Sequence, residues 1–249
     1  MKKNSSVSAS LKDVETHYCA GCGHGIIHRL VAQAIDDLGI REQTVGIAPV
    51  GCAVIAYDYW NFDVSEAAHG RALAVATGIK RCQPKLTVFT YQGDGDLASI
   101  GIAETLHAAN RGENLTCFFI NNACYGMTGG QMAPTTIIGQ KTTTTPWGRD
   151  PSAGDGWPLK VSELLSNLKG VGFVARGAVS SPQKVKQVSE YIKIAFTNQI
   201  KNKGFSLVEI LSPCPTIWRK TPVESVKWIE MVMVQEFPLG IIKNNSIDL

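Results

Sequence analysis

The sequence predicts an α/β domain with a doubly wound, mostly parallel sheet. Apolar runs rich in β-branched and aromatic residues alternate along the chain with segments of helical periodicity. This alternation is typical of parallel sheets with helices on both faces. Two of the runs, 86–92 and 115–120, enclose a single helix-like segment. Because a strand, a helix and a strand in this order form a crossover unit, we expect both strands to be parallel.

The other elements follow from apolar periodicity and from residues that begin or end helices. Apolar β-branched runs predict strands at 44–50, 86–92, 115–120, 172–179 and 204–211. Helical periodicity predicts helices at about 26–38, 69–81, 97–109, 161–168, 182–197 and 221–236. Gly39 is a typical residue for ending the first helix, whereas Pro182 and Thr221 suit the starts of the last two.

Two irregular segments interrupt this pattern. Residues 53–62 are interpreted as an apolar and aromatic segment packed under a loop, with a substrate or partner surface as the alternative. Residues 123–158 are rich in Gly, Thr and Pro and predict a long irregular loop. Loops of this length in a compact domain are usually functional, so we expect a lid or a cofactor clamp. The residues after 236 are expected at the surface.

Composition and charge are those of a globular protein. The chain has 249 residues, of which 44% are apolar and 18% charged, and its net charge of +3 gives no reason to expect nucleic acid as a partner. We expect residues 1–12 to be a disordered lead-in and residues 13–249 to form a single domain. No apolar run reaches membrane-spanning length and no signal peptide is visible, so we expect no membrane span and a cytoplasmic location.

Polar residues and glycines follow both strands of the crossover unit. Gly93-Asp94-Gly95-Asp96 ends the first apolar run, and Asn121-Asn122 ends the second. Parallel strands that stop at one edge bring these groups together, and carboxylate and amide oxygens are ligands that Mg²⁺ accepts beside a diphosphate. The glycines allow close backbone approach, and the next helix points its N-terminus at the anion. The sequence therefore predicts a metal–diphosphate site, with ordinary turn chemistry as the alternative.

The pairing of these two motifs resembles the thiamine diphosphate fingerprint. Further motifs follow one order along the chain: Cys19-Ala-Gly-Cys22-Gly-His, Pro49-Val-Gly-Cys52, Glu66-Ala-Ala-His69-Gly-Arg, Gln92-Gly-Asp-Gly-Asp96, Asn121-Asn-Ala-Cys-Tyr-Gly-Met-Thr-Gly-Gly-Gln131 and Ser212-Pro-Cys-Pro-Thr216. Together, over about residues 12–236, they resemble the beta subunit of 2-oxo acid:ferredoxin oxidoreductases, which act on 2-oxoisovalerate, 2-oxoglutarate or pyruvate. The resemblance implies a thiamine diphosphate-binding fold of the pyrophosphate-binding type.

The resemblance also implies roles for individual residues. Asp94, Asn122 and the carbonyl of Cys124 would bind Mg²⁺. The cofactor would contact Val50, Gly51, Cys52, Ala53, His69, Gly93, Asp94, Gly95, Asp96, Asn122, Gly126 and Met127. His69, at the start of a helix, and Met127 or Thr128, near the thiazolium, are the candidate catalytic residues.

Four cysteines lie on expected loops beside Gly or Pro: Cys19, Cys22, Cys52 and Cys214. Such a set suits a Cys₄ metal site, but its spacing does not distinguish zinc from iron–sulfur. A redox dithiol at Cys19 and Cys22 is a further alternative. The family resemblance implies a [4Fe–4S] cluster. Cys82 and Cys117 are expected to be structural and buried, and the side chain of Cys124 is assigned no role.

By the same resemblance, the expected activity is the oxidative decarboxylation of a 2-oxo acid. It depends on thiamine diphosphate, Mg²⁺ and a [4Fe–4S] cluster, yields acyl-CoA and CO₂, uses coenzyme A and passes electrons to ferredoxin. The expected substrate is 2-oxoisovalerate or 2-oxoglutarate. The segment Ala53-Val54-Ile55 carries no cation for a second carboxylate, which favours a branched-chain or broad-range 2-oxo acid over 2-oxoglutarate, with an arginine from the partner subunit as the alternative. The alternatives are a non-oxidative thiamine diphosphate decarboxylase with structural zinc, and a redox-sensing α/β module that binds neither cofactor.

Two expected features are missing from the sequence. No residue can be assigned as the glutamate that thiamine enzymes place against the aminopyrimidine, because Glu66 and Glu104 are interpreted as helix-surface or packing residues. There is also no C-x-x-C-x-x-C-x-x-x-C run of a ferredoxin-type cluster. Both absences predict one subunit of a complex, in which an alpha subunit completes the active site. Ferredoxin-like and gamma subunits are further candidate partners.

Overall fold

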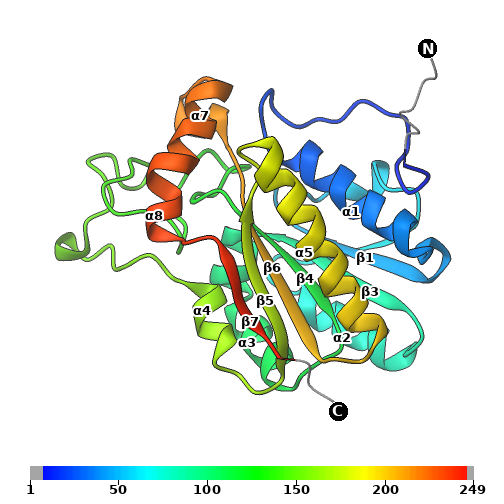
Figure 1. The fold of residues 1–249 in the computed structure, drawn as a ribbon. Helices are drawn as coiled ribbons and strands as arrows, with labels where there is room; N and C mark the ends of the chain where they lie inside the picture. The colour runs from blue at the N-terminus through cyan, green and yellow to red at the C-terminus, as the bar shows by residue number, and fades with distance from the viewer. Residues whose placement is uncertain (1–7, 246–249) are drawn as a thin grey trace.

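The computed structural model describes residues 8–245, which form a seven-stranded sheet with helices on both faces (Figure 1). The strands are β1 (Thr44–Pro49), β2 (Asp63–Ala67), β3 (Thr87–Gly93), β4 (Thr116–Asn121), β5 (Val171–Ala178), β6 (Phe205–Leu211) and β7 (Gly240–Asn244). Their order is β2-β1-β3-β4-β6-β5-β7, and every neighbouring pair is parallel except β5 and β7. The predicted doubly wound, mostly parallel sheet is confirmed.

The helices form two layers. They are α1 (His24–Leu38), α2 (Ala72–Cys82), α3 (Ile102–Asn110), α4 (Val161–Ser166), α5 (Pro182–Ile200), α6 (Pro215–Trp218), α7 (Pro222–Trp228) and α8 (Val234–Glu236). The helices α1 and α5 lie side by side on one face, and α2, α3 and α4 cover the other (Figure 1). Within residues 8–245, no helix is both long and apolar enough to cross a membrane.

The central strands are apolar throughout because helices cover both of their faces. Every residue of β4, β5 and β6 is buried. On the α1–α5 face, the rings of Phe89, Phe118 and Phe196 lie within 5.7 Å of one another between centroids. On the opposite face α2 presents Ala72 and Ala76, both fully buried. These small side chains let the helix pack closely on the sheet.

Two edge strands were missed in the sequence. The strand β2 reads Asp-Val-Ser-Glu-Ala and β7 reads Gly-Ile-Ile-Lys-Asn, and both keep exposed positions. Edge strands lack the continuous apolar run that identifies a central strand. The interpretation of Glu66 as a helix-surface residue is therefore wrong, because Glu66 lies in β2. Similarly, α2 begins at Ala72 with Arg71 as its N-cap, so His69 precedes the helix rather than capping it.

The expected disordered lead-in, residues 1–12, lies outside the described residues up to position 7. From Ser8 to Lys12 the structure differs from that expectation. The hydroxyl groups of Ser8 and Ser10 donate to the carboxylate of Asp36 on α1. Leu11 forms a β-bridge with Trp60, which is fully buried. This segment is held by hydrogen bonds that composition alone did not reveal, and the burial of Trp60 agrees with a packed segment at 53–62.

A buried ionic network links the end of β4 to β6 and β5. Arg176 on β5 and Glu209 on β6 form a salt bridge of 2.7 Å between Nε and Oε2, and both side chains are almost fully buried. The other carboxylate oxygen of Glu209 accepts a hydrogen bond of 2.7 Å from the amide of Asn121, at the end of β4. Glu163 on α4 binds the guanidinium from outside. The network therefore holds the last residue of β4 in place.

We expect Arg176→Met to lower the free energy of unfolding by about 3–5 kcal/mol, because the carboxylate of Glu209 would be buried without its cation. Arg81→Met is the matched control, since Arg81 is an exposed partner in a salt bridge with Glu113. It should cost less than about 1 kcal/mol. Urea unfolding followed by circular dichroism measures both. Equal losses in the two variants would contradict a structural role for the buried network.

Candidate active site

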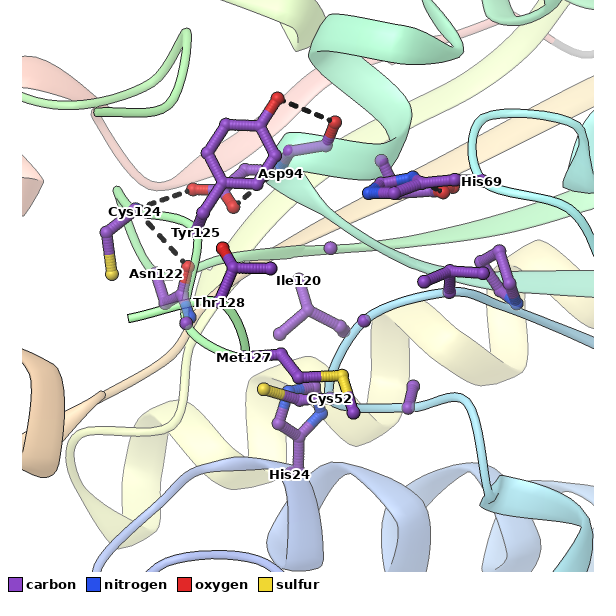
Figure 2. Close-up of a pocket in the computed structure, with 18 of the residues that line it drawn as sticks. His24, Cys52, His69, Asp94, Ile120, Asn122, Cys124, Tyr125, Met127 and Thr128 are labelled. Atoms are coloured by element: carbon purple, nitrogen blue, oxygen red, sulfur yellow. Dashed lines mark hydrogen bonds and ion pairs between the residues drawn. The ribbon is translucent and has the colours of Figure 1, made fainter. Parts of the chain in front are cut away.

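A cavity lies where β1, β3 and β4 end (Figure 2). All residues that the sequence assigned to the thiamine and magnesium site line it: Val50, Gly51, Cys52, Ala53, His69, Gly93, Asp94, Gly95, Asp96, Asn122, Cys124, Gly126, Met127 and Thr128. The residues that sequence reasoning did not assign are His24, Pro49, Tyr91, Ile120 and Tyr125. His24, Pro49 and Tyr125 belong to the quoted motifs, whereas Tyr91 and Ile120 resemble any other buried strand residue.

Asp94 is the most constrained polar residue of the cavity. Its side chain is 2% exposed, and burial raises its pKa to about 7. The carboxylate accepts hydrogen bonds from the backbone N–H groups of Gly95, at 2.8 Å, and Cys124, at 3.0 Å. The hydroxyl of Thr135 donates to it at 2.6 Å. These donors hold the carboxylate in a fixed position at the end of β3.

Three groups from two strand ends bring oxygen atoms together. One atom of the Asn122 side-chain amide lies 3.2 and 3.3 Å from the two carboxylate oxygens of Asp94 and 2.7 Å from the carbonyl oxygen of Cys124. If the amide nitrogen occupies this position, it donates to all three oxygens. If the amide oxygen does, only a cation can hold the oxygens together. Neighbouring ligands in a magnesium octahedron are about 2.9 Å apart, so the arrangement fits Mg²⁺.

The two asparagines at the end of β4 have different tasks. Asn121 points into the protein, where its amide nitrogen binds Glu209 and its amide oxygen accepts the N–H of Ala123 at 3.1 Å. Ala123 adopts a left-handed conformation with φ of 55°. This turn brings the side chain of Asn122 and the backbone of Cys124 to the cavity (Figure 2). The first asparagine therefore shapes the turn, and the second faces the site.

His69 is held by Asp96 rather than by a helix end. Its Nδ1 lies 2.5 Å from Oδ1 of Asp96. The same carboxylate accepts the N–H of Gly70 at 2.6 Å and the amide of Gln92 at 2.5 Å. Burial raises the pKa of Asp96, while these donors and His69 act in the opposite direction. Asp96 therefore orients the imidazole at the edge of the cavity.

The predicted cluster ligands line a second pocket: Cys19, Cys22, Cys52 and Cys214. It shares a wall with the first cavity, made by His24, Cys52, Asn122, Gly126 and Met127. Gly126 permits this close arrangement, since a Cβ there would lie 3.3 Å from the sulfur of Cys52 and 3.7 Å from that of Cys214. Burial raises the pKa of Cys22 to about 11 and that of Cys52 to about 12.

In residues 8–245, no three His, Cys, Asp or Glu side chains lie close enough to hold a single metal ion. The sulfur atoms of a tetrahedral zinc site are about 3.8 Å apart, given Zn–S bonds of about 2.3 Å. A four-iron cluster binds its cysteines through four different iron atoms, so its sulfur ligands are spread more widely.

Comparison with known proteins identifies the family. Residues 50–210 match the family model described as "Thiamine pyrophosphate enzyme, C-terminal TPP binding domain". The 2-oxoglutarate synthase subunit KorB of Archaeoglobus fulgidus is 37% identical over 215 residues, which cover 86% of this chain and 76% of the relative. The chain belongs to the beta subunits of the 2-oxoacid:ferredoxin oxidoreductases.

Other members of the beta-subunit family extend the comparison. The ketoisovalerate oxidoreductase subunit VorA of Methanothermobacter thermautotrophicus is 50% identical over 233 residues, covering 94% of this chain and 49% of the relative. The chain thus spans about half the length of the VorA relatives. The solved 2-oxoglutarate:ferredoxin oxidoreductase from Magnetococcus marinus, with 2-oxoglutarate, coenzyme A and succinyl-CoA bound, has a TM-score of 0.80 and 25% identity, covering 98% of this chain and 87% of that one.

The remaining cysteines of this beta subunit differ from one another. Cys117 is buried in β4, as expected. Cys82 is exposed at the end of α2, so the expectation that it is buried is wrong. The thiol of Cys124 is buried and hydrogen-bonded to the thiol of Cys214. Cys124 therefore contacts the cysteine pocket through its side chain and the oxygen cluster through its backbone.

The long loop of the beta subunit is built around Arg149. This side chain is 5% exposed, and its guanidinium donates to backbone carbonyl groups of Ala133, Pro134, Thr136, Asp155, Gly156 and Trp157. Thr135 of the same loop binds Asp94. The segment 123–158 is therefore an organised loop anchored on the cavity, and its expected role as a lid or cofactor clamp stays a prediction.

We expect Asp94→Ala to weaken the Mg²⁺-dependent binding of thiamine diphosphate at least 100-fold, or about 2.7 kcal/mol, because a fixed charged ligand is lost. Asp58→Ala is the control, since Asp58 is exposed in a short turn. Isothermal titration measures both affinities, and circular dichroism checks that each variant folds. Full cofactor affinity in Asp94→Ala would refute the assignment of the oxygen cluster.

Proposed function

We propose that this beta subunit carries the thiamine diphosphate and the [4Fe–4S] cluster of a 2-oxo acid:ferredoxin oxidoreductase. The enzyme would convert a 2-oxo acid and coenzyme A to acyl-CoA and CO₂, with electrons passed to ferredoxin. One observation carries the proposal: an oxygen-ligand site at the strand ends shares a wall with a pocket lined by four cysteines. A reaction that releases electrons at a cofactor needs an acceptor next to it, and a cluster held by the four cysteines would be that acceptor.

Residues of the first cavity would hold Mg²⁺ and the diphosphate. Asp94, Asn122 and the carbonyl of Cys124 would be the metal ligands, and Gly95 and Gly126 line the cavity in which the phosphate groups would lie. When bound, thiamine diphosphate supplies the nucleophile and the electron sink for loss of CO₂ from a 2-oxo acid. Gly95 cannot be replaced without rearrangement, because a Cβ there would lie 2.2 Å from the ring of Tyr125. The protein's part is to fix the cofactor and keep the cavity narrow.

Cys19, Cys22, Cys52 and Cys214 would hold the cluster. Burial raises the pKa of the Cys22 and Cys52 thiols, so a positively charged cluster core is the natural partner for these two sulfurs once they are deprotonated. The shared wall then separates cofactor and cluster by single side chains. His69, Met127 and Thr128 line the cofactor cavity and remain the candidates for contacting the reacting groups.

The proposed substrate is 2-oxoisovalerate or a related branched 2-oxo acid. No Lys or Arg of the described residues lines the cavity, so a second carboxylate would be buried without a cation. The VorA relative at 50% identity is named a ketoisovalerate oxidoreductase subunit, whereas the KorB relative at 37% is named for 2-oxoglutarate.

A partner chain would complete the active site. No glutamate of residues 8–245 lines the cavity; Glu66 is exposed on β2, and Glu104 pairs with Arg71. The side chains of Trp147 and Trp157, on the loop held by Arg149, are 91% and 73% exposed. Exposed tryptophans on a rigid loop are typical of protein interfaces. We assign this surface to the alpha subunit, with ferredoxin-like and gamma subunits as further partners.

The proposed location is the cytoplasm, because seven free cysteines suit a reducing compartment.

We expect this chain, purified without oxygen, to contain about four iron atoms and no stoichiometric zinc. Cys214→Ser should lose most of this iron, because the cluster would lose one ligand. Cys82→Ser should keep all of it, since Cys82 is exposed at the end of α2 and does not line the cysteine pocket. Metal analysis and visible absorption measure the outcome. One zinc per chain without iron would point instead to a non-oxidative thiamine enzyme.

The assembled complex is expected to use 2-oxoisovalerate with a kcat/KM at least about 100-fold above that for 2-oxoglutarate, because an unpaired buried carboxylate costs several kcal/mol. The assay is acyl-CoA formation coupled to reduction of ferredoxin. A preference for the dicarboxylate would refute the lack of a Lys or Arg in the cavity lining as the origin of specificity.

A further inference from the structure

His24 lies in the wall between the two pockets, and none of the roles described above uses it. It begins α1, two residues after Cys22, and its side chain is 5% exposed. The imidazole lines both the cofactor cavity and the cysteine pocket. Figure 2 shows the ring reaching into the cavity from the side opposite Asp94. A buried polar ring in this position needs a partner for each of its nitrogen atoms.

One nitrogen of His24 has its partner within the protein. Nδ1 lies 2.9 Å from the hydroxyl of Tyr91, which is fully buried on β3. That hydroxyl has no other hydrogen-bond partner among residues 8–245. A buried hydroxyl donates its proton where an acceptor is available, so Tyr91 donates and Nδ1 accepts. The neutral ring then carries its own proton on Nε2.

The other nitrogen faces the cavity without a partner in the described part of the chain. Within residues 8–245 no group accepts a hydrogen bond from Nε2. The ring cannot turn easily, because it stacks on Tyr18 with centroids 4.8 Å apart and an interplanar angle of 18°. The N–H group of Nε2 is thus a donor of fixed direction. Leaving it unpaired in a closed site would cost free energy, which a ligand oxygen removes.

The other hydroxyl donors of the cavity are already engaged. Thr128 donates to the side chain of Gln131, and Tyr125 donates to the backbone carbonyl of Gly95. The imidazole of His69 is held by Asp96 near the oxygen cluster. Since no Lys or Arg of the described residues lines the cavity, this chain offers a bound anion neutral donors only. At the cysteine-pocket end of the cavity, the free ring N–H is that of His24.

We propose that His24 is a substrate-binding residue, whose Nε2–H donates a hydrogen bond to an oxygen of the 2-oxo acid. Tyr91 acts as a positioning residue, because its hydroxyl determines which nitrogen carries the proton. This inference rests on the proposed function, since it assumes that a 2-oxo acid binds in the cavity. It adds a residue of this chain that contacts the substrate, in a cavity to which the described residues contribute no Lys or Arg.

The test compares three variants in the complex assembled with its partner subunits. His24→Leu removes the donor, His24→Gln retains an N–H donor, and Tyr91→Phe removes the hydroxyl that selects the tautomer. The binding probe is N,N-dimethyloxamate, which keeps the carboxylate and adjacent carbonyl of 2-oxoisovalerate but resists addition. Anaerobic titration gives its Kd, and steady-state kinetics give kcat and KM. Iron content and thiamine diphosphate affinity are measured for every variant.

We expect His24→Leu to weaken binding of the probe at least about 30-fold and to raise KM for the 2-oxo acid similarly, with a smaller change in kcat. His24→Gln should recover most of this loss, and Tyr91→Phe should weaken binding about 5- to 10-fold. If His24→Leu alters iron content, the other two variants, compared at full iron content, decide the outcome. The proposal is overturned if all three variants bind the probe as tightly as the wild-type complex does.

If His24→Gln keeps its iron but binds the probe as weakly as His24→Leu, the hydrogen-bonding role is also overturned, because glutamine still supplies an N–H donor. Failure of the proposed function looks different. In that case the wild-type complex neither decarboxylates any 2-oxo acid nor binds the probe, and the variants at position 24 give the same negative result.

Discussion

The convergence of the Asp94 carboxylate, the Asn122 side-chain amide and the Cys124 carbonyl is the constraint on which the rest of the site depends. The parallel register pairs Gly93 with Ile120, so the residues that follow leave the sheet at one edge. Burying the carboxylate of Asp94 is costly unless donors or a cation compensate for lost water. The donors come from the turn after β4 and from Thr135 of the long loop. The crossover unit and the loop are therefore coupled through one carboxylate.

The same turn connects the oxygen cluster to the cysteine pocket. Cys124 supplies its carbonyl to the first, and its buried thiol is hydrogen-bonded to the thiol of Cys214, which lines the second. Two residues later, Gly126 lies against the sulfurs of Cys52 and Cys214, where a larger residue would push the loops apart. The proximity of a cofactor and an electron acceptor thus follows from a short segment with small side chains. The function we propose needs this proximity, because electrons must leave the first cavity.

The sequence predicted the central sheet and the cavity because their signals are local. Buried parallel strands are continuous apolar runs, and the residues that end them are polar in a spacing that resembles a known fingerprint. The edge strands β2 and β7 escaped prediction because half-exposed strands carry mixed residues. His24 and Tyr91 were missed as a pair because a hydrogen bond across 67 positions leaves no sequence pattern. The different roles of Asn121 and Asn122 were not predictable either, because they depend on the left-handed turn at Ala123.

The most direct test of the oxygen cluster is the metal dependence of cofactor binding. The complex is stripped of metal and cofactor without oxygen, and thiamine diphosphate is titrated with and without Mg²⁺. The account predicts that affinity rises at least about 100-fold when Mg²⁺ is present, because the metal joins the protein oxygens to the diphosphate. Equal affinity in the presence of Mg²⁺ and of a chelator would show that the converging oxygens of Asp94, Asn122 and Cys124 do not form a metal site.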